Sequence, residues 1–263
     1  MKILLRYSEN FFKIPVKKVV DLIDKYDKNN LISGYEVYIS SLTNSKMNYI
    51  KEIAEIVKQK NQILNIRGIS LENSILLHYD FLKFYNKIAD LLDKDITITY
   101  SPLWLCDKAE GVYKTNVILK RLIKNINDNS YRLNICIENI DEKEKQFTPF
   151  DVINIVKIVD NINFTYSIGN MYLKENQEYK LNRSLEKRLK NICINNLSDI
   201  NSLRYLNIDF DKLFYYLNEI GYKNNFIINL DVDNIKGDNL EEKMISALLE
   251  VEKVDKINKM YQI

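Results

Sequence analysis

This chain has few of the residues that cross-link a fold or bind metals. Its 263 residues contain three cysteines and a single histidine. Cys106, Cys136 and Cys193 are odd in number and far apart in the sequence. Their spacing matches neither a disulfide framework nor a cysteine-based metal site, and it suits a reducing compartment. We therefore expect a cytoplasmic location.

The chain also lacks an excess of charge and a long apolar run. Lys and Arg number 38 against 36 Asp and Glu, so the net charge is only +2. A balance this close gives no reason to expect a nucleic-acid or membrane-surface partner. The apolar runs are short and interrupted by charges, which predicts no transmembrane span. The N-terminal sequence MKILLRYSENFF turns polar too early for a signal peptide.

Glycine and proline are scarce as well, with six and three residues. The first expected strand, residues 2–7, is followed by SENFFKIP, which contains no glycine. A dinucleotide-binding sheet often carries a glycine-rich phosphate loop at that place, so this absence counts against such a fold. Asparagine is abundant instead, together with lysine, isoleucine and tyrosine. A single asparagine is therefore weak evidence of function.

What the chain does contain is a regular alternation of strand-like and helix-like segments. Helical spacing of apolar residues, with Pro15 or Pro149 before two helices and Gly221 after another, separates the apolar strand-like runs. We expect Asn73 to cap the third helix, with Leu76 on its apolar face. Eight strand–helix units predict a single parallel (β/α)8 TIM barrel over residues 1–263. The expected strands are 2–7, 34–40, 63–68, 95–104, 133–140, 162–173, 190–197 and 224–232.

The fifth expected strand, LNICIENI at residues 133–140, contains the most informative residue. It is a nearly continuous apolar run that ends in Glu138 and Asn139. Such a run is typical of a strand buried on both faces, where an unpartnered carboxylate is costly. Active sites of α/β barrels lie at the C-terminal ends of the strands. Glu138 is therefore the first candidate for chemistry.

Read together, the strand ends resemble a known superfamily. GYEVYI, IENI, SIGN, ICINN and the final strand–helix–Gly-Tyr–strand segment follow the order of the xylose isomerase-like barrels. That superfamily includes sugar phosphate isomerases and epimerases and the endonuclease IV nucleases. The resemblance implies a metal-binding glutamate at Glu138 and a second glutamate at Glu36.

The other positions depart from the pattern that the resemblance implies. Neutral residues stand where Asp, His or Glu ligands are usual, and only Asp231 offers another carboxylate nearby. A divalent site needs several anionic or imidazole ligands, so we expect no cofactor, and Mn, Zn or Mg at Glu138 only if the site is intact despite these changes. The departing positions are Asn65, Tyr100, Ser167, Asn170, Cys193, Asn196 and Asn229.

Two interpretations of Glu138 remain open. It could serve a ligand or a reaction, or it could be held by Arg6 or Arg67 in a network across the barrel mouth. That network would be structural, or it would hold an anionic ligand. Asn170, Asn196 and Asn229 are candidates for a polar binding ring. The further ligand-binding candidates are Asn139, Ser167, Cys193 and Asp231.

Four further side chains have a structural alternative. Tyr100 and Trp104 could form a stacking platform for a sugar, although aromatic residues near a barrel mouth more often pack under loops. Cys193 has no histidine partner for nucleophilic catalysis. We interpret His78 as a residue of a helix surface or interface rather than a metal ligand.

Three functions follow, in order of preference. The first is a pseudoenzyme, a sugar phosphate isomerase- or epimerase-like barrel that has lost its metal and binds a small carbohydrate or anionic ligand. The second is an active isomerase or epimerase that uses Glu138 and Glu36. The third is an endonuclease IV-like nuclease, which would need a ligand cluster that this chain lacks. The oligomeric state is open.

Overall fold

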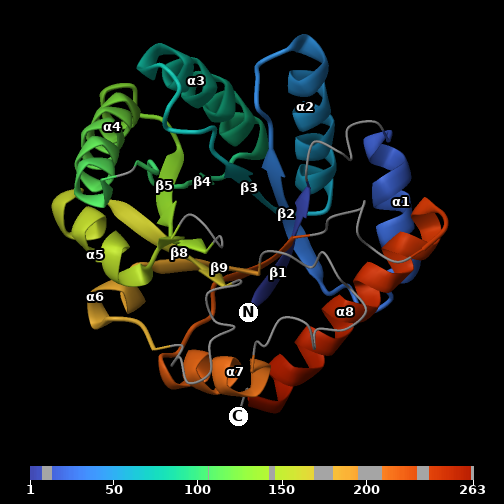
Figure 1. The fold of residues 1–263 in the computed structure, drawn as a ribbon. Coiled ribbons are helices and arrows are strands. Elements are labelled where there is room, and N and C mark those ends of the chain that lie inside the picture. The colour runs from blue at the N-terminus through green and yellow to red at the C-terminus, as the bar shows by residue number, and fades with distance from the viewer. Residues whose placement is uncertain are drawn as a thin grey trace.

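The computed structural model describes residues 1–7, 14–105, 107–141, 146–168, 180–194, 209–229 and 237–261. Eight parallel strands close into a barrel in the order β1-β10-β9-β8-β5-β4-β3-β2. The helices surround these strands in chain order from α1 to α8 (Figure 1). The expected (β/α)8 TIM barrel is therefore confirmed. No helix in the described ranges is both long and apolar enough to cross a bilayer.

Some strands are shorter than the sequence pattern predicted. The fourth ends at Tyr100, where the apolar pattern continued to Trp104, and the fifth ends at Glu138 instead of Ile140. The sixth is described as far as Ile168, and residues 169–173 of its expected range lie outside the described residues. A two-stranded antiparallel hairpin, which the sequence analysis did not predict, follows the fifth barrel strand. The barrel strands are β1 Lys2–Tyr7, β2 Ile32–Tyr38, β3 Ile63–Arg67, β4 Ile96–Tyr100, β5 Leu133–Glu138, β8 Ile162–Ile168, β9 Leu189–Ile194 and β10 Asn225–Asn229; the hairpin is β6 Ile140–Asp141 and β7 Gln146–Phe147.

The helices begin and end at recognisable signals. Thr148 and Asp151 form a capping box around Pro149, as a helix start requires, and Gly221 follows α7 with a left-handed φ of 65°. The helix start at Pro149 and the helix end at Gly221 were expected from the sequence, and the capping box was not. The helices are α1 Val16–Tyr26, α2 Asn44–Gln59, α3 Ile75–Leu92, α4 Lys108–Asp128, α5 Pro149–Ile158, α6 Arg183–Glu186, α7 Phe210–Glu219 and α8 Leu240–Tyr261.

Helix α3 corrects three expectations. Its cap is Ser74, whose hydroxyl accepts a hydrogen bond from the Leu77 amide at 3.3 Å, and not Asn73. Leu76 is 69% exposed, because the buried face of the helix is turned away from it. His78 is fully buried instead of lying on a helix surface. Its ring meets the Tyr100 ring edge to face at 5.7 Å, and neither ring nitrogen has a hydrogen-bond partner among the residues that the structure describes.

The inside of the barrel is unusually polar. TIM barrels are usually filled with branched apolar side chains. Here the Asn191 side chain bonds Asn65, Thr165 and Asn225 at 3.0–3.3 Å, and so links strands β3, β8, β9 and β10. Some of these strands are not neighbours, so the side chains meet across the interior. A small apolar cluster of Leu4, Cys193, Ile227 and Ile63 lies beside this network.

Candidate functional site

Glu138 and Arg67 form the central contact at the C-terminal end of the barrel. Arg67 is the last residue of β3 and Glu138 is the last residue of β5. The guanidinium engages both carboxylate oxygens, with Nη1 donating to Oε2 at 2.9 Å and Nη2 donating to Oε1. The Ser101 hydroxyl donates to Glu138 Oε1 at 2.5 Å and accepts from Arg67 Nη2 at 3.1 Å. The Glu138 carboxylate is therefore held by three donors.

A second buried ion pair lies on the neighbouring strands. Arg6 of β1 and Glu36 of β2 are aligned in the parallel register, and Arg6 Nε donates to Glu36 Oε1 at 2.6 Å. Both residues are buried, and in the described ranges the second carboxylate oxygen of Glu36 has no hydrogen-bond partner. The Glu–Arg network that the sequence suggested at the barrel mouth is thus present, with each carboxylate matched to its own arginine.

The surrounding charges keep Glu138 and Arg6 ionised. Burial by itself would raise the pKa of Glu138, but the charges of Arg67 and Arg6 and the bonds from Arg67 and Ser101 outweigh it, so the pKa lies below its usual value. Burial acts in the opposite direction on Arg6, and the charges of Cys193, Glu36 and Glu138 still raise its pKa. Glu138 is accordingly an ionised hydrogen-bond acceptor and a weak base.

Asn139 is already used within the fold. Its amide nitrogen donates to the Ser167 carbonyl at 2.7 Å, and its amide oxygen accepts from the Ser167 amide at 2.8 Å. The side chain therefore joins the end of β5 to the end of β8. Both residues are buried. This arrangement gives Asn139 a structural role beside the site.

The two aromatic candidates do not share a face. Tyr100 is buried against α3, and a Cβ atom added to Gly68 would approach its ring at 2.4 Å. The interpretation of Tyr100 as a stacking platform is therefore corrected, because its ring lies outside the barrel wall. Trp104 follows β4, is partly exposed and packs edge to face on Phe147 of the hairpin at 5.9 Å. Its position agrees with the alternative of packing under a loop.

Two other candidates are closed off from solvent. Cys193 is fully buried beside Leu4 and Ile227, and burial raises the pKa of its thiol to about 12. It is the second-last residue of β9, near the strand end as expected. Asn65 lies in the middle of β3 and bonds Asn191, although the sequence analysis placed it near a strand end. The depth of Asn65 follows from strand register, which a sequence pattern alone does not fix.

The remaining candidates cannot all be compared with the structure. Asn170, Asn196 and Asp231 lie outside the described residues. Asn229 is the last residue of β10 and aligns with Arg6 in the β1–β10 register, which puts its backbone at the same level as the ion pairs. The roles of these residues in binding stay predictions.

Ser101 is a contact that the sequence analysis missed. The signal was available, because Thr97, Thr99 and Ser101 alternate along ITITYSP and so face one side of the strand. Apolar periodicity drew attention to the isoleucines between them. The hydroxyls of that side face the barrel interior, where Thr99 shares a hydrogen bond with Thr165 at 3.2 Å.

The described carboxylates at the mouth, Glu36 and Glu138, do not fit the divalent ion that the family resemblance implied. Both oxygens of Glu138 accept from Arg67, and Glu36 is paired with Arg6. An ion at Glu138 would have to displace a bidentate guanidinium and lie close to its positive charge. Across the described part of the chain, no three His, Cys, Asp or Glu side chains gather as a metal-binding group.

Comparison with solved structures supports the fold. The chain is similar to D-psicose 3-epimerase from Clostridium cellulolyticum, at 15% identity and a TM-score of 0.71, over 99% of each chain. It is similar to an L-ribulose 3-epimerase at 13% identity and a TM-score of 0.67, over 100% of this chain and 99% of the other. A 3-keto-D-glucoside 4-epimerase from E. coli matches at 13% and 0.66, over 96% and 99%.

These likenesses define the class of fold: the chain is a closed (β/α)8 TIM barrel, similar in architecture to these sugar epimerases. At this level of identity they establish the architecture alone. No protein-family model matches the sequence, and no curated protein matches it.

Proposed function

We propose that this protein binds a small carbohydrate or other polar ligand at the C-terminal mouth of the barrel and does not use a divalent metal there. The main observation in support of the proposal is the bidentate hydrogen bonding of Arg67 to the Glu138 carboxylate. A guanidinium supplies the positive charge next to Glu138 that a metal would otherwise supply. The fold likeness to sugar epimerases supports a sugar-like ligand.

Charge at the mouth favours a neutral hydroxylated ligand over a strong anion. Arg6 and Arg67 are each matched by one buried carboxylate, so the four side chains have no net charge. An anion would gain little attraction and would have to compete with Glu138 for Arg67. Sugar hydroxyls can both donate to a carboxylate oxygen and accept from a guanidinium. Arg67 is 26% exposed at its side chain, which leaves it accessible to such a ligand.

Metal analysis of the purified protein tests the first half of the proposal. We expect no stoichiometric Mn, Zn or Mg after dialysis, and no saturable uptake when each ion is titrated. Glu138→Gln serves as the matched variant, because it removes the carboxylate and keeps the side-chain shape. An ion that binds tightly to the native protein and not to the variant would refute the proposed absence of a metal.

A binding panel tests the second half. Free sugars and sugar phosphates are titrated by calorimetry into the native protein and into Arg67→Ala. We expect at least one sugar to bind the native protein, and the variant to bind it at least about tenfold more weakly. Equal affinities would remove Arg67 from the site.

An active isomerase or epimerase is the second candidate, favoured by the fold likeness to sugar epimerases. Glu138, with Glu36 or Asp231, would then move the proton. The lowered pKa of Glu138 argues against it as a strong general base. This candidate predicts turnover of some sugar that Glu138→Gln abolishes, and it loses its support if the native protein converts none of a broad panel. A nuclease activity is the least supported function.

A further inference from the structure

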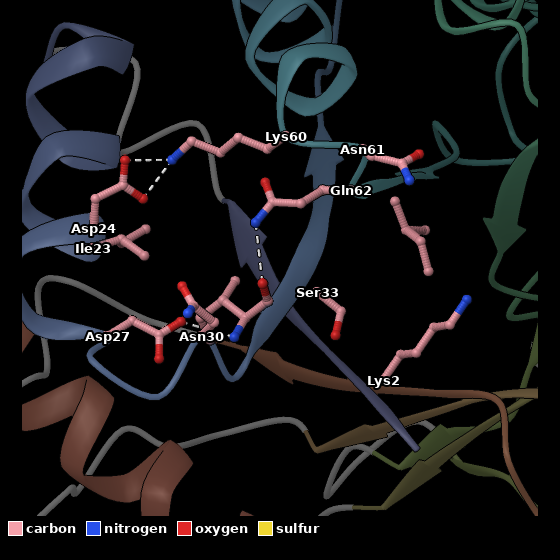
Figure 2. Close-up of a pocket in the computed structure, with 11 residues that line it drawn as sticks. Lys2, Ile23, Asp24, Asp27, Asn30, Ser33, Lys60, Asn61 and Gln62 are labelled. Atoms are coloured by element: carbon pink, nitrogen blue, oxygen red, sulfur yellow. Dashed lines mark hydrogen bonds and ion pairs between the residues drawn. The ribbon is translucent and has the colours of Figure 1, made fainter.

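A cavity of about 680 Å³ lies at the end of the barrel opposite the ion pairs. It is formed where α1 leads into β2 and α2 leads into β3, with the start of β1 beside them (Figure 2). Its volume falls within the range of small-molecule sites, about 300–1,000 Å³. The lining residues are Lys2, Ile23, Asp24, Asp27, Asn30, Ile32, Ser33, Lys60, Asn61, Gln62 and Ile63.

The walls of this cavity are held in place by contacts between distant parts of the chain. The Asp27 carboxylate accepts from the Leu31 and Ile32 amides at 2.8 and 2.9 Å. The Gln62 amide nitrogen donates to the Ile32 carbonyl at 3.0 Å. Lys60 forms an ion pair with Asp24 across the gap between the two helices, as Figure 2 shows. The cavity is therefore preformed, which lowers the cost of binding.

Some hydrogen-bonding groups around the cavity already have partners within the protein, and others do not. Both oxygens of Asp24 accept from Lys60, and both oxygens of Asp27 accept from backbone amides. The Asn61 oxygen accepts from Lys94, which leaves its amide nitrogen as a donor. Within the described part of the chain, no contact engages the Lys2 ammonium or the Ser33 hydroxyl, and the buried side-chain oxygen of Gln62 has no hydrogen-bond partner. The carboxylate acceptors are thus occupied, the donors of Lys2, Ser33 and Asn61 are available, and Gln62 can accept a hydrogen bond from a ligand hydroxyl.

We propose that this cavity is a second binding site, which takes a small organic phosphate or carboxylate. The anionic group would bind the Lys2 ammonium and the Ser33 hydroxyl, because a bond between charged partners is stronger than a neutral one. The carbon skeleton would lie against Ile32 and Ile63. Asn61 would donate a further hydrogen bond from the opposite wall.

Calorimetry at constant ionic strength tests this site with three probes: inorganic phosphate, glycerol 3-phosphate and malate. We expect one-to-one saturable binding of glycerol 3-phosphate or malate, and weaker binding of inorganic phosphate, which lacks a carbon skeleton. Lys2→Met should weaken binding by about tenfold, since it removes the charged donor and keeps the length of the side chain.

Two matched variants separate this site from other sources of binding. Lys28 is exposed in the turn between α1 and β2 and does not line the cavity. Lys28→Met should therefore leave the affinity for the probes unchanged. Arg67→Ala changes the mouth and should also leave it unchanged. The proposal is overturned if none of the three probes binds the native protein, if Lys28→Met weakens binding as much as Lys2→Met does, or if Arg67→Ala abolishes binding.

Discussion

At the scale of single residues, the mouth of the barrel contains charges that are costly to bury and costly to separate. Glu36 and Glu138 are 0% and 2% exposed, and each has one arginine partner. Desolvating two charges can cost as much as their attraction returns, so such pairs contribute little net stability. Removing one partner leaves the other buried and uncompensated. The pairs therefore specify the geometry of the mouth more than they stabilise the fold.

The substitution Glu138→Gln tests whether Arg67 destabilises the fold when its buried charge is left without a partner. We expect the free energy of unfolding at pH 7 to fall by about 3 kcal/mol, the low end for a buried pair, because Arg67 is partly exposed. The lowered pKa of Glu138 gives the native protein stability that is complete above pH ~4.5 and is lost as the pH falls through the folded-state pKa. The variant should lack that acid-dependent part. Urea denaturation of the native protein and the variant from pH 7 to 3 measures both effects. If the free energy of unfolding falls equally steeply with pH below about 4.5 in the two proteins, the expected role of Glu138 is contradicted.

At the scale of elements, helix α3 contains a buried histidine that the sequence pattern misplaced. A histidine next to Leu77 in an amphipathic segment reads as a surface residue, since neighbouring positions of a helix face different directions. The apolar face of α3 is broad enough to include His78 and to exclude Leu76. The periodicity identified the helix correctly, but the edge of its buried face depends on how the helix packs on β4.

His78→Leu should stabilise the protein in mild acid. Burial lowers the pKa of His78 below 6.5, so the unfolded chain binds a proton more readily than the folded one. Stability should therefore fall as the pH drops from about 6.5 towards the folded-state pKa, and leucine at this position removes that fall. We expect a gain of about 1 kcal/mol at neutral pH as well, since two unpaired buried nitrogens disappear. Thermal unfolding at pH 7.5 and 5.5 measures the difference, which should be larger at pH 5.5.

The β2–β3 contact depends on a glycine. A Cβ atom on Gly34 would lie 2.0 Å from the Ile63 carbonyl oxygen of the neighbouring strand. Gly34→Ala should therefore separate these strands and cost more than about 3 kcal/mol or prevent folding. Gly221→Ala is the matched control: its added atom meets nothing within 4 Å, and only the left-handed φ of 65° opposes it. That change should cost about 1 kcal/mol. Chemical denaturation of both variants checks that Gly34→Ala loses more stability than Gly221→Ala.

At the scale of the whole molecule, the sequence predicted the architecture well and the interior poorly. Eight alternating units and the position of Glu138 were sufficient for the barrel, and the Arg67–Glu138 contact was among the expected alternatives. The depth of Asn65 and the outward position of Tyr100 were not predictable. They depend on strand register and stagger, and one residue of slip exchanges the two faces of a strand.

The Asn191 network should act on the entire barrel. Asn191→Ala leaves buried polar groups of Asn65, Asn225 and Thr165 without their shared partner and creates a cavity. We expect a loss of about 3 kcal/mol in the free energy of unfolding, in a single cooperative transition. Asn127→Ala, on the exposed face of α4, should stay within about 0.5 kcal/mol. A loss for Asn191→Ala as small as that of the control would show that water replaces the network.

The closure of β1 on β10 has a consequence for synthesis on the ribosome. Strand β1 cannot pair with its second neighbour, β10, until residues 225–229 have left the ribosome. Helix α8 then packs beside α1, where Glu241 accepts hydrogen bonds from Lys25 and Tyr26. Until then the nascent sheet has two open edges, at β1 and at its latest strand. Unpaired strand edges promote aggregation. Until β10 pairs with β1, the earlier strands therefore carry an exposed edge that favours aggregation.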